Sequence, residues 1–255
     1  LHAAGRMAQR DIESTLYLYF RATEGPDQEA ANLFKAASDR FWALTSKVDG
    51  TFEFAVQPVR EYFAARFLAE WAGRDRREPL PKQQVLQQLI DRNYWLNTAR
   101  FYAGFAPPNE LAGLRYGIEE AMERARHPLQ ERVAAWALMS DAIFANDIRV
   151  QRDVAGLLTD DLSTVLLARH SESNINFPRL TPANGAEQVS NHLFHAIESG
   201  PAGDLTPARV DVLRERVAID KDTFVTWWKA RLDASAGTPD QAAWLRVGGR
   251  FGAPR

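Results

Sequence analysis

The chain has 255 residues, of which 45% are hydrophobic and 25% are charged, a composition typical of a folded globular protein and not of a disordered tail. Its 31 basic and 33 acidic residues leave a formal net charge of −2, which provides no bulk electrostatic attraction to nucleic acid or to an anionic membrane. The absence of cysteine excludes disulfides, a thiolate zinc site and a cysteine nucleophile.

The sequence carries no pattern for export or membrane insertion. No signal-peptide pattern follows Leu1, and no segment offers the roughly 20 apolar residues that a membrane-spanning helix needs. We therefore expect a cytoplasmic protein that does not contact a membrane. The first residue is Leu1 and not methionine, which suggests a piece of a longer protein.

The first elements along the chain are a helix and a hairpin. Residues 27–46 carry apolar side chains at helical spacing, and the end of this segment, 41–46, can leave the helix as a short strand. An Asp-Gly pair then precedes an alternating apolar run over 51–56. Because glycine tolerates the positive φ of a tight turn, this combination predicts a β-hairpin.

A second helix is expected directly after the hairpin. Pro58 suits the first turn of a helix, where its missing amide hydrogen is not needed. Apolar residues then recur every four positions and define a face that we expect to be buried, with Phe63 at its centre. These residues are Val59, Phe63, Phe67 and Trp71. Helix, hairpin and helix together fit the end of a winged-helix domain.

The composition changes after this second helix. Residues 73–81 contain three arginines and two prolines and are predicted to be a linker. It would separate a winged-helix-type region, residues 1–72, from an α-helical repeat-like region, residues 82–255. The expected fold class is mainly α, with one short β-hairpin.

No strand pattern follows the linker. Residues 128–145 place Trp136 and other apolar side chains on one helical face, and Thr-Pro pairs at Thr181, Thr206 and Thr238 mark the starts of later helices. The unequal spacing of these starts fits stacked helical hairpins of the divergent HEAT-like type better than a strict repeat. Residues 171–185 are expected to form the longest loop.

Two adjacent tryptophans, Trp227 and Trp228, are candidates for partner binding. Neighbouring positions on a helix point about 100° apart, so one narrow buried stripe cannot cover both indoles. One tryptophan is expected to pack inward with Phe224 and Leu232, and the other to lie at the edge of that face, where an aromatic ring can anchor a partner. The alternative is a broad buried face that covers both.

The most informative segment is 52–68, which reads F-E-F-A-V-Q-P-V-R-E-Y-F-A-A-R-F-L. It resembles the closing winged-helix motif of NACHT-type STAND ATPases, which runs in outline F-x-F-x-H-x-x-x-(Q)-E-Y-F-A-A-x-x-L. The bracketed glutamine is the loosest position of that outline, and here it is Arg60. The matching motif residues are Phe52, Phe54, Glu61, Tyr62, Phe63, Ala64 and Ala65. Residues 94–105 look like the W-x-x-x-x-x-F-x-A/S-G segment that often follows in such proteins. Core packing of an aromatic stripe remains the direct physical role of these side chains in any fold.

The resemblance implies a place within a larger signalling protein. In that family a nucleotide-binding module precedes the winged helix, and a variable sensor, often built from helical repeats, follows it. ADP holds the protein closed, whereas trigger recognition and ATP exchange open it into a homo-oligomer, and bacterial members are commonly antiphage sensors. This chain would contain the end of the winged helix and a helical sensor that binds a protein trigger, with recognition in 109–255. ATP, ADP and Mg²⁺ are expected in the parent protein.

The sequence departs from the family pattern in two places. It contains no G-x-x-x-x-G-K-[ST] loop, so we expect no ATPase activity and no cofactor in this chain itself. Val56 stands where the family histidine would reach the ADP phosphate, and valine has neither a donor nor a charge. Gln57 lies next to it and is the alternative donor.

One histidine cluster invites comparison with metal sites. His192, His195 and Glu198 are spaced i, i+3 and i+6 on an expected helix, so that neighbouring members could share a metal. The spacing is not H-E-x-x-H, and such short matches arise often by chance. We therefore favour surface or half-buried structural histidines and predict no metal site.

Two other functions stay open. The first is a winged-helix transcription regulator with a helical effector domain, and the second is a helical protein-interaction scaffold. The regulator needs a basic recognition helix before the hairpin, but residues 27–46 carry Asp27, Glu29 and Asp39 against Lys35 and Arg40. Binding to nucleic acid is therefore not expected.

Overall fold

The computed structural model describes residues 7–22, 32–36, 44–48, 51–72, 81–169 and 177–252. The predicted linker falls largely on 73–80, outside these ranges. The chain divides into two compact units, Leu1–Ala65 and Arg66–Arg255. The division falls within helix α3, Gln57–Trp71, and each unit is described separately below.

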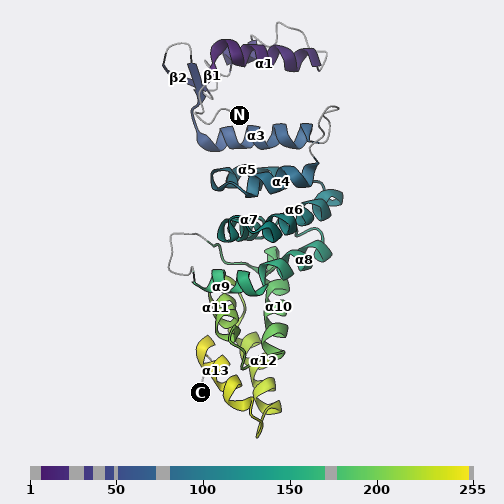
Figure 1. Cartoon of the computed structure of the whole chain (residues 1–255), viewed down its shortest axis with the longest axis vertical. Helices are drawn as coiled ribbons and strands as arrows, with labels where there is room; N and C mark the ends of the chain where they lie inside the picture. Colours follow the sequence, from purple (N-terminus) through teal and green to yellow (C-terminus); the bar gives the residue numbers. More distant parts are fainter. Residues whose placement is uncertain are drawn as a thin grey trace. The chain divides into compact units, whose positions relative to one another are not determined.

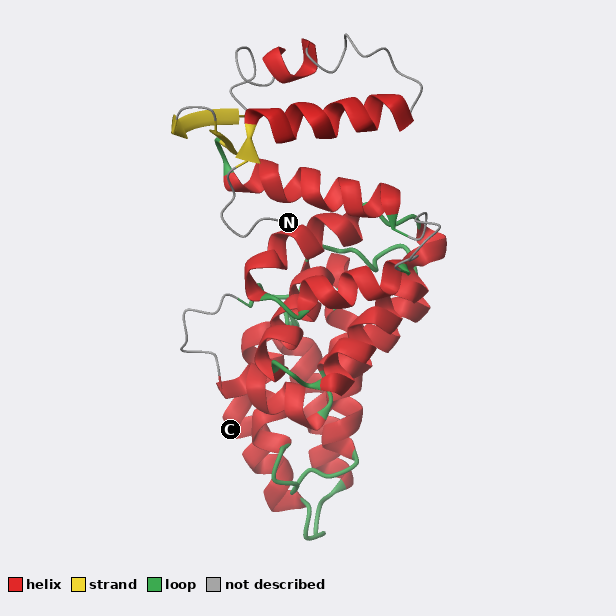
Figure 2. Cartoon of the chain, turned by 45° about the horizontal axis from the view of Figure 1, so that its top comes forward, coloured by secondary structure: helices red, strands yellow, loops and turns green. Residues whose placement is uncertain are grey.

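The first unit contains a small antiparallel sheet beside helices (Figure 2). Strands β1 (Met7–Ala8), β2 (Leu44–Val48) and β3 (Thr51–Phe54) form a sheet of order β1-β3-β2. β3 pairs with both neighbours, and its partners place Met7 opposite Phe52 and Leu44 opposite Phe54.

The predicted hairpin of the first unit is confirmed by the pairing of β2 with β3. Its Asp-Gly pair, residues 49–50, lies outside the described residues. Within the expected helix over 27–46, residues 32–36 are helical, and the strand begins at Leu44. Helix α1 (Gln9–Ala22) and strand β1 were not predicted.

Helix α3 begins at Gln57, and Pro58 takes its second position, as the fixed φ of proline allows. The expectation that its aromatic stripe is buried is wrong. Phe63 is 51% exposed and Phe67 is 58% exposed, whereas Glu61 and Ala65 are the buried residues of this helix. The Phe63 ring stacks on Phe54, with centroids 6.0 Å apart, and leaves half of its own surface exposed.

The second unit is a series of consecutive helical hairpins (Figure 1). In each hairpin two helices adjacent in the chain pack on each other. The pairs are α4 (Lys82–Ile90) with α5 (Leu96–Gly104), α6 (Leu111–Arg124) with α7 (Pro128–Ser140), α8 (Ile148–Leu158) with α9 (Asp161–Arg169), α10 (Ala186–Glu198) with α11 (Thr206–Arg216), and α12 (Lys221–Ala234) with α13 (Gln241–Phe251). Short 3₁₀ turns lie at Asn93–Trp95, Pro108–Glu110 and Pro182–Asn184.

The hairpins of the second unit stack in two layers. Helices α4, α6, α8 and α10 pack successively in one layer, and α5, α7, α9, α11 and α13 pack successively in the other. The predicted mainly α fold with a short β-hairpin is confirmed. In residues 81–169 and 177–252, the β-structure consists of one isolated bridge between Leu180 and Val217.

Helix α7 forms the centre of this stack. It contacts α5, α6, α8 and α9, and it is therefore buried on nearly all sides, from Ala134 to Met139. The prediction of a single apolar face over 128–145 is therefore wrong, because α7 is buried on more than one face. The helix also ends earlier than predicted, at Ser140. Phe144 is fully buried from a turn that follows the helix, and the Trp136 indole donates to the carbonyl of Pro178 at 2.8 Å.

The Thr-Pro pairs lie near helix starts, but their hydroxyls do not all cap them. Thr181 precedes the 3₁₀ turn that leads into α10, where its amide donates to Asn184 Oδ1. Thr206 is the first residue of α11, and its hydroxyl donates backwards to the carbonyl of Gly200 at 2.8 Å. Thr238 lies in the turn before α13, which begins at Gln241.

Candidate functional site

A groove of about 490 Å³ runs between α8 and α10 on one layer of the helical stack. Both helices contribute side chains to it. Its lining residues are Ile148 and Arg152 of α8, and Glu187, Gln188, Asn191, His192 and His195 of α10.

Local sequence explains why these faces point outward. Asp147 caps α8 by accepting from the amides of Arg149 at 3.0 Å and Val150 at 3.2 Å. In α10, Val189, Leu193 and Ile197 recur every four residues and are fully buried. The polar stripe over 187, 191 and 195 therefore lies on the other side of the helix, toward the groove.

Gly156 allows one groove residue to approach the backbone of α8 closely. A Cβ added at Gly156 would lie 3.3 Å from His192 Cε1, a tight contact. Glycine inside a helix costs roughly 0.5–1 kcal/mol relative to alanine. In return, the half-buried imidazole of His192 rests directly against α8.

The polar side chains of this groove have no internal partner among the residues that the structure describes. Within the described part of the chain, Arg152 and the five α10 lining residues form no side-chain hydrogen bond or ion pair. Many charged groups elsewhere in the second unit are paired, for example Arg132 with Asp160 at 3.2 Å and Arg209 with Asp161 at 3.1 Å. The groove therefore presents donors and acceptors that are available to a ligand.

The cluster compared with metal sites does not come together. Glu198 accepts from the indole of Trp227 at 2.6 Å and pairs with Arg231 at 2.7 Å, so its carboxylate is directed to α12. His192 and His195 line the groove instead. Among the residues that the structure describes, no group of three His, Cys, Asp or Glu side chains could hold a metal.

The two tryptophans of α12 differ in burial. Trp228 is 6% exposed, and its indole donates to the carbonyl of Trp244 at 2.7 Å. Trp227 is half-buried, with its ring centroid 4.2 Å from that of Phe194 and its N–H on Glu198. Both indoles thus take part in packing the last hairpins, and binding of a partner by Trp227 stays a prediction.

Val56 and Gln57, which the resemblance would place at a nucleotide contact, lie at the start of α3. Val56 is 55% exposed, and its carbonyl accepts from the amide of Val59 at 3.1 Å at the start of α3. The Gln57 amide donates to Glu61 Oε1 at 2.6 Å. This bond engages the side-chain donor that was the alternative to the missing histidine.

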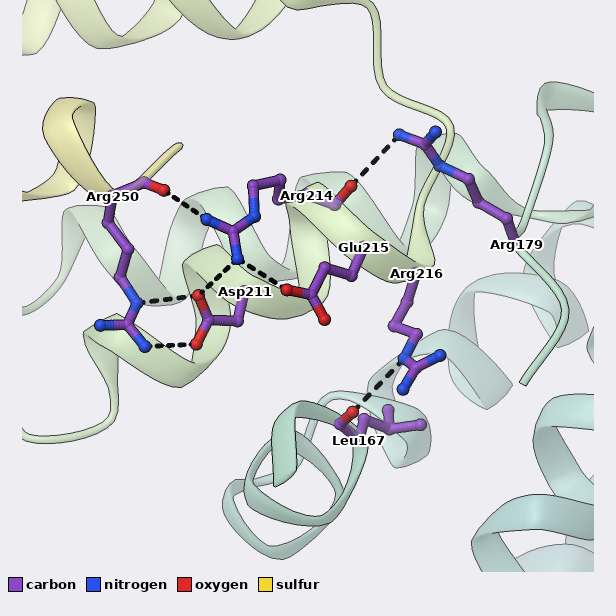
Figure 3. A network of polar contacts seen from close by, with 7 residues as sticks. All are labelled: Leu167, Arg179, Asp211, Arg214, Glu215, Arg216 and Arg250. Atoms are coloured by element: carbon purple, nitrogen blue, oxygen red, sulfur yellow. Dashed lines mark hydrogen bonds and ion pairs between the residues drawn. The ribbon is translucent and has the colours of Figure 1, made fainter. Parts of the chain in front are cut away.

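A separate polar network joins α11 to its neighbours (Figure 3). Arg250 of α13 donates with two nitrogens to the carboxylate of Asp211, and Arg214 donates to the carbonyl of Arg250 at 2.8 Å. Arg216 points the other way, donating to the carbonyl of Leu167 at 3.4 Å, and its burial lowers the pKa of the guanidinium. These contacts fix α9, α11 and α13 together and have a structural role.

Sequence reasoning did not single out the groove residues Arg152, Glu187, Gln188 and Asn191. The signal that could have found them is the polar stripe at 187, 191 and 195, opposite the buried stripe of α10. It indicated a solvated helix face. The α8 residue that forms the opposite wall, Arg152, lies 35 residues before Glu187 in the sequence (187 − 152), so local periodicity does not reveal the groove.

No family model matches this chain, and no curated protein or solved structure matches it at a significant level. No helix within the described residues is long and apolar enough to cross a membrane.

Proposed function

We propose that this chain is the regulatory and trigger-sensing portion of a NACHT-type STAND signal-transduction ATPase that acts in bacterial antiphage defence. The observation that carries the proposal is the order of elements: hairpin β2–β3, then α3 with the E-Y-F-A-A motif, then stacked helical hairpins. This is the order of winged helix and helical sensor in that family.

In this proposal the two parts of the chain have different tasks. The motif region belongs to the winged helix that couples the nucleotide state to the sensor. The helical hairpins, chiefly residues 109–255, bind a protein trigger, because stacked hairpins present long surfaces whose residues can vary without disturbing the core. ATP, ADP and Mg²⁺ bind to a module of the parent protein, which acts in the cytoplasm as a homo-oligomer.

The position of Val56 alters one step of the family scheme. An exposed valine offers no hydrogen bond to a phosphate, and the neighbouring Gln57 amide is bonded to Glu61. ADP would therefore be held in the parent protein by groups outside this motif.

The decisive test is the coding sequence upstream of Leu1 and the protein that it encodes. We expect a G-x-x-x-x-G-K-[ST] loop there, and a full-length protein whose ATP-dependent oligomerisation is lost when the lysine of that loop is replaced by alanine. A DNA-binding domain upstream, or no nucleotide module, would reject the proposal in favour of a transcription regulator or a scaffold.

Two further measurements address the separate parts. Calorimetry on the purified chain should detect no micromolar binding of ATP, because the phosphate-binding loop is absent from it. Exchanging residues 109–255 between this protein and a relative should transfer trigger specificity. Unchanged specificity would show that recognition lies elsewhere.

A further inference from the structure

We infer that the groove between α8 and α10 binds an extended peptide segment of the partner protein, by hydrogen bonds to the peptide backbone. The inference rests on the proposed sensor function in one respect, because that function identifies the partner as a protein. Its evidence is the polar lining of the groove, the spacing of that lining and the absence of internal partners for it among the described residues.

The lining favours a peptide over a small apolar ligand. Small-molecule pockets are lined mainly by hydrophobic and aromatic side chains with few polar groups. In this groove Ile148 is the apolar exception among seven lining residues. The carboxamides of Gln188 and Asn191 each offer both donors and an acceptor, which is the pair of functions that a peptide group requires.

The spacing along α10 matches an extended chain. Residues 187, 191 and 195 are four apart, which corresponds to about 6.0 Å along a helix. An extended strand repeats every two residues, or about 6.4–6.8 Å. A strand laid along α10 would thus present every second peptide group to Glu187, Asn191 and His195 in turn.

The charges of the groove add side-chain selectivity. Arg152 stands on the α8 wall and Glu187 on the α10 wall, and neither has an ion-pair partner among the described residues. Arg152 would pair with an acidic side chain of the peptide and Glu187 with a basic one. His192 rests against Gly156 and contributes its ring to the lining of the same groove.

Phage display of random linear peptides on the immobilised 255-residue chain tests the inference. Selected peptides are then synthesised, and their affinities are measured by fluorescence anisotropy. Asn191→Ala should weaken binding about tenfold, since two net hydrogen bonds are lost. Arg152→Glu should shift the selection from peptides with an acidic residue to peptides with a basic one.

Matched controls and a backbone scan complete the design. Asn109→Ala and Arg126→Gln alter exposed residues outside the groove and should leave affinity unchanged. N-methylation of single peptide nitrogens should weaken binding at every second position, because an extended strand turns alternate N–H groups toward α10.

Several results would overturn the inference. The display could enrich no peptides, or the selected peptides could bind equally well to both groove variants. N-methylation could weaken binding with a helical period and not at every second position. The chain could also form a dimer that Asn191→Ala dissociates, which would assign the groove to a second copy. Peptide binding depends on the helical stack alone. Peptide binding can therefore be confirmed even if the upstream sequence rejects the STAND proposal. Conversely, it can be refuted even if the STAND proposal is confirmed.

Discussion

Replacing Gly248 by alanine tests how closely α13 packs on α12. An added Cβ would overlap Trp228 Cε2 and lie 2.7 Å from its Nε1, far inside van der Waals contact. The indole has little room to move, because Trp228 is 6% exposed and its N–H donates to the carbonyl of Trp244. At Gly249, the next residue of the same helix, an added Cβ would meet no described atom within 4 Å apart from its chain neighbours and the backbone of its own helix.

The two glycines should therefore respond with opposite signs. At Gly248, overpacking costs roughly 1–3 kcal/mol and a displaced indole hydrogen bond about 1 kcal/mol, against a gain of about 1 kcal/mol in helix propensity. We expect Gly248→Ala to lower the free energy of unfolding by about 1–3 kcal/mol. Gly249→Ala keeps only the propensity gain and should raise it by up to about 1 kcal/mol.

Urea and thermal denaturation, followed by tryptophan fluorescence, measure both effects. For a protein of this size, 1 kcal/mol corresponds to a Tm shift of roughly 2–4 °C. In a Trp228→Leu background the penalty of Gly248→Ala should shrink, because the ring atoms that the new methyl group meets are gone. Stabilisation by Gly248→Ala, or the same penalty in both backgrounds, would refute the packing of α13 on this indole.

Three other substitutions test particular contacts by the same denaturation measurements. Gly117→Ala should cost about 1–3 kcal/mol, because its Cβ would lie 2.7 Å from a backbone oxygen of α4. Gly113→Ala meets no described atom within 4 Å outside its own helix, and it should stabilise α6 by about 0.5–1 kcal/mol. Phe63→Ala should cost about 1 kcal/mol and not the roughly 3–5 kcal/mol of a fully buried aromatic, since its side chain is half exposed. A loss of about 3 kcal/mol or more would indicate that the Phe63 side chain is buried after all. Asp160→Ala should cost about 2–3 kcal/mol, because it removes the cap of α9 and leaves the buried Arg132 without its carboxylate. Asp160→Asn keeps the cap and should cost about 1 kcal/mol. Equal costs would contradict separate contributions of the cap and the ion pair.

The sequence predicts those parts of the fold that depend on local patterns. The Asp-Gly pair and the alternation over 51–56 identified the β2–β3 hairpin, and apolar periodicity together with Thr-Pro pairs identified a stack of helices. Strand β1 was missed, because its two residues acquire strand geometry by pairing with β3, a contact across more than 40 residues. Periodicity found the aromatic face of α3, but it could not show that Glu61 and Ala65, and not Phe63, are the covered positions.

The candidate site was less accessible to sequence reasoning than the fold. His192 and His195 attracted attention as metal ligands, and the structure places them as part of a groove whose other members looked like ordinary solvated residues. Only the stacking of α8 against α10 brings Arg152 and Asn191 into the lining of one groove. Such a pairing depends on tertiary packing, and no local pattern encodes it.

For the proposed sensor function, the burial of the two tryptophans changes where partner recognition should be sought. Trp227 packs on Phe194 and binds Glu198, so its truncation would weaken the contact between α10 and α12 even in the absence of a partner. Loss of a trigger response in Trp227→Ala would therefore not identify a partner contact by itself. The polar groove residues other than His192 behave differently, because among the described residues their side chains form no hydrogen bond or ion pair. A surface that can change without loss of stability is what a sensor of variable triggers requires, and in this stack the polar walls of α8 and α10 meet that condition better than the aromatic cluster does.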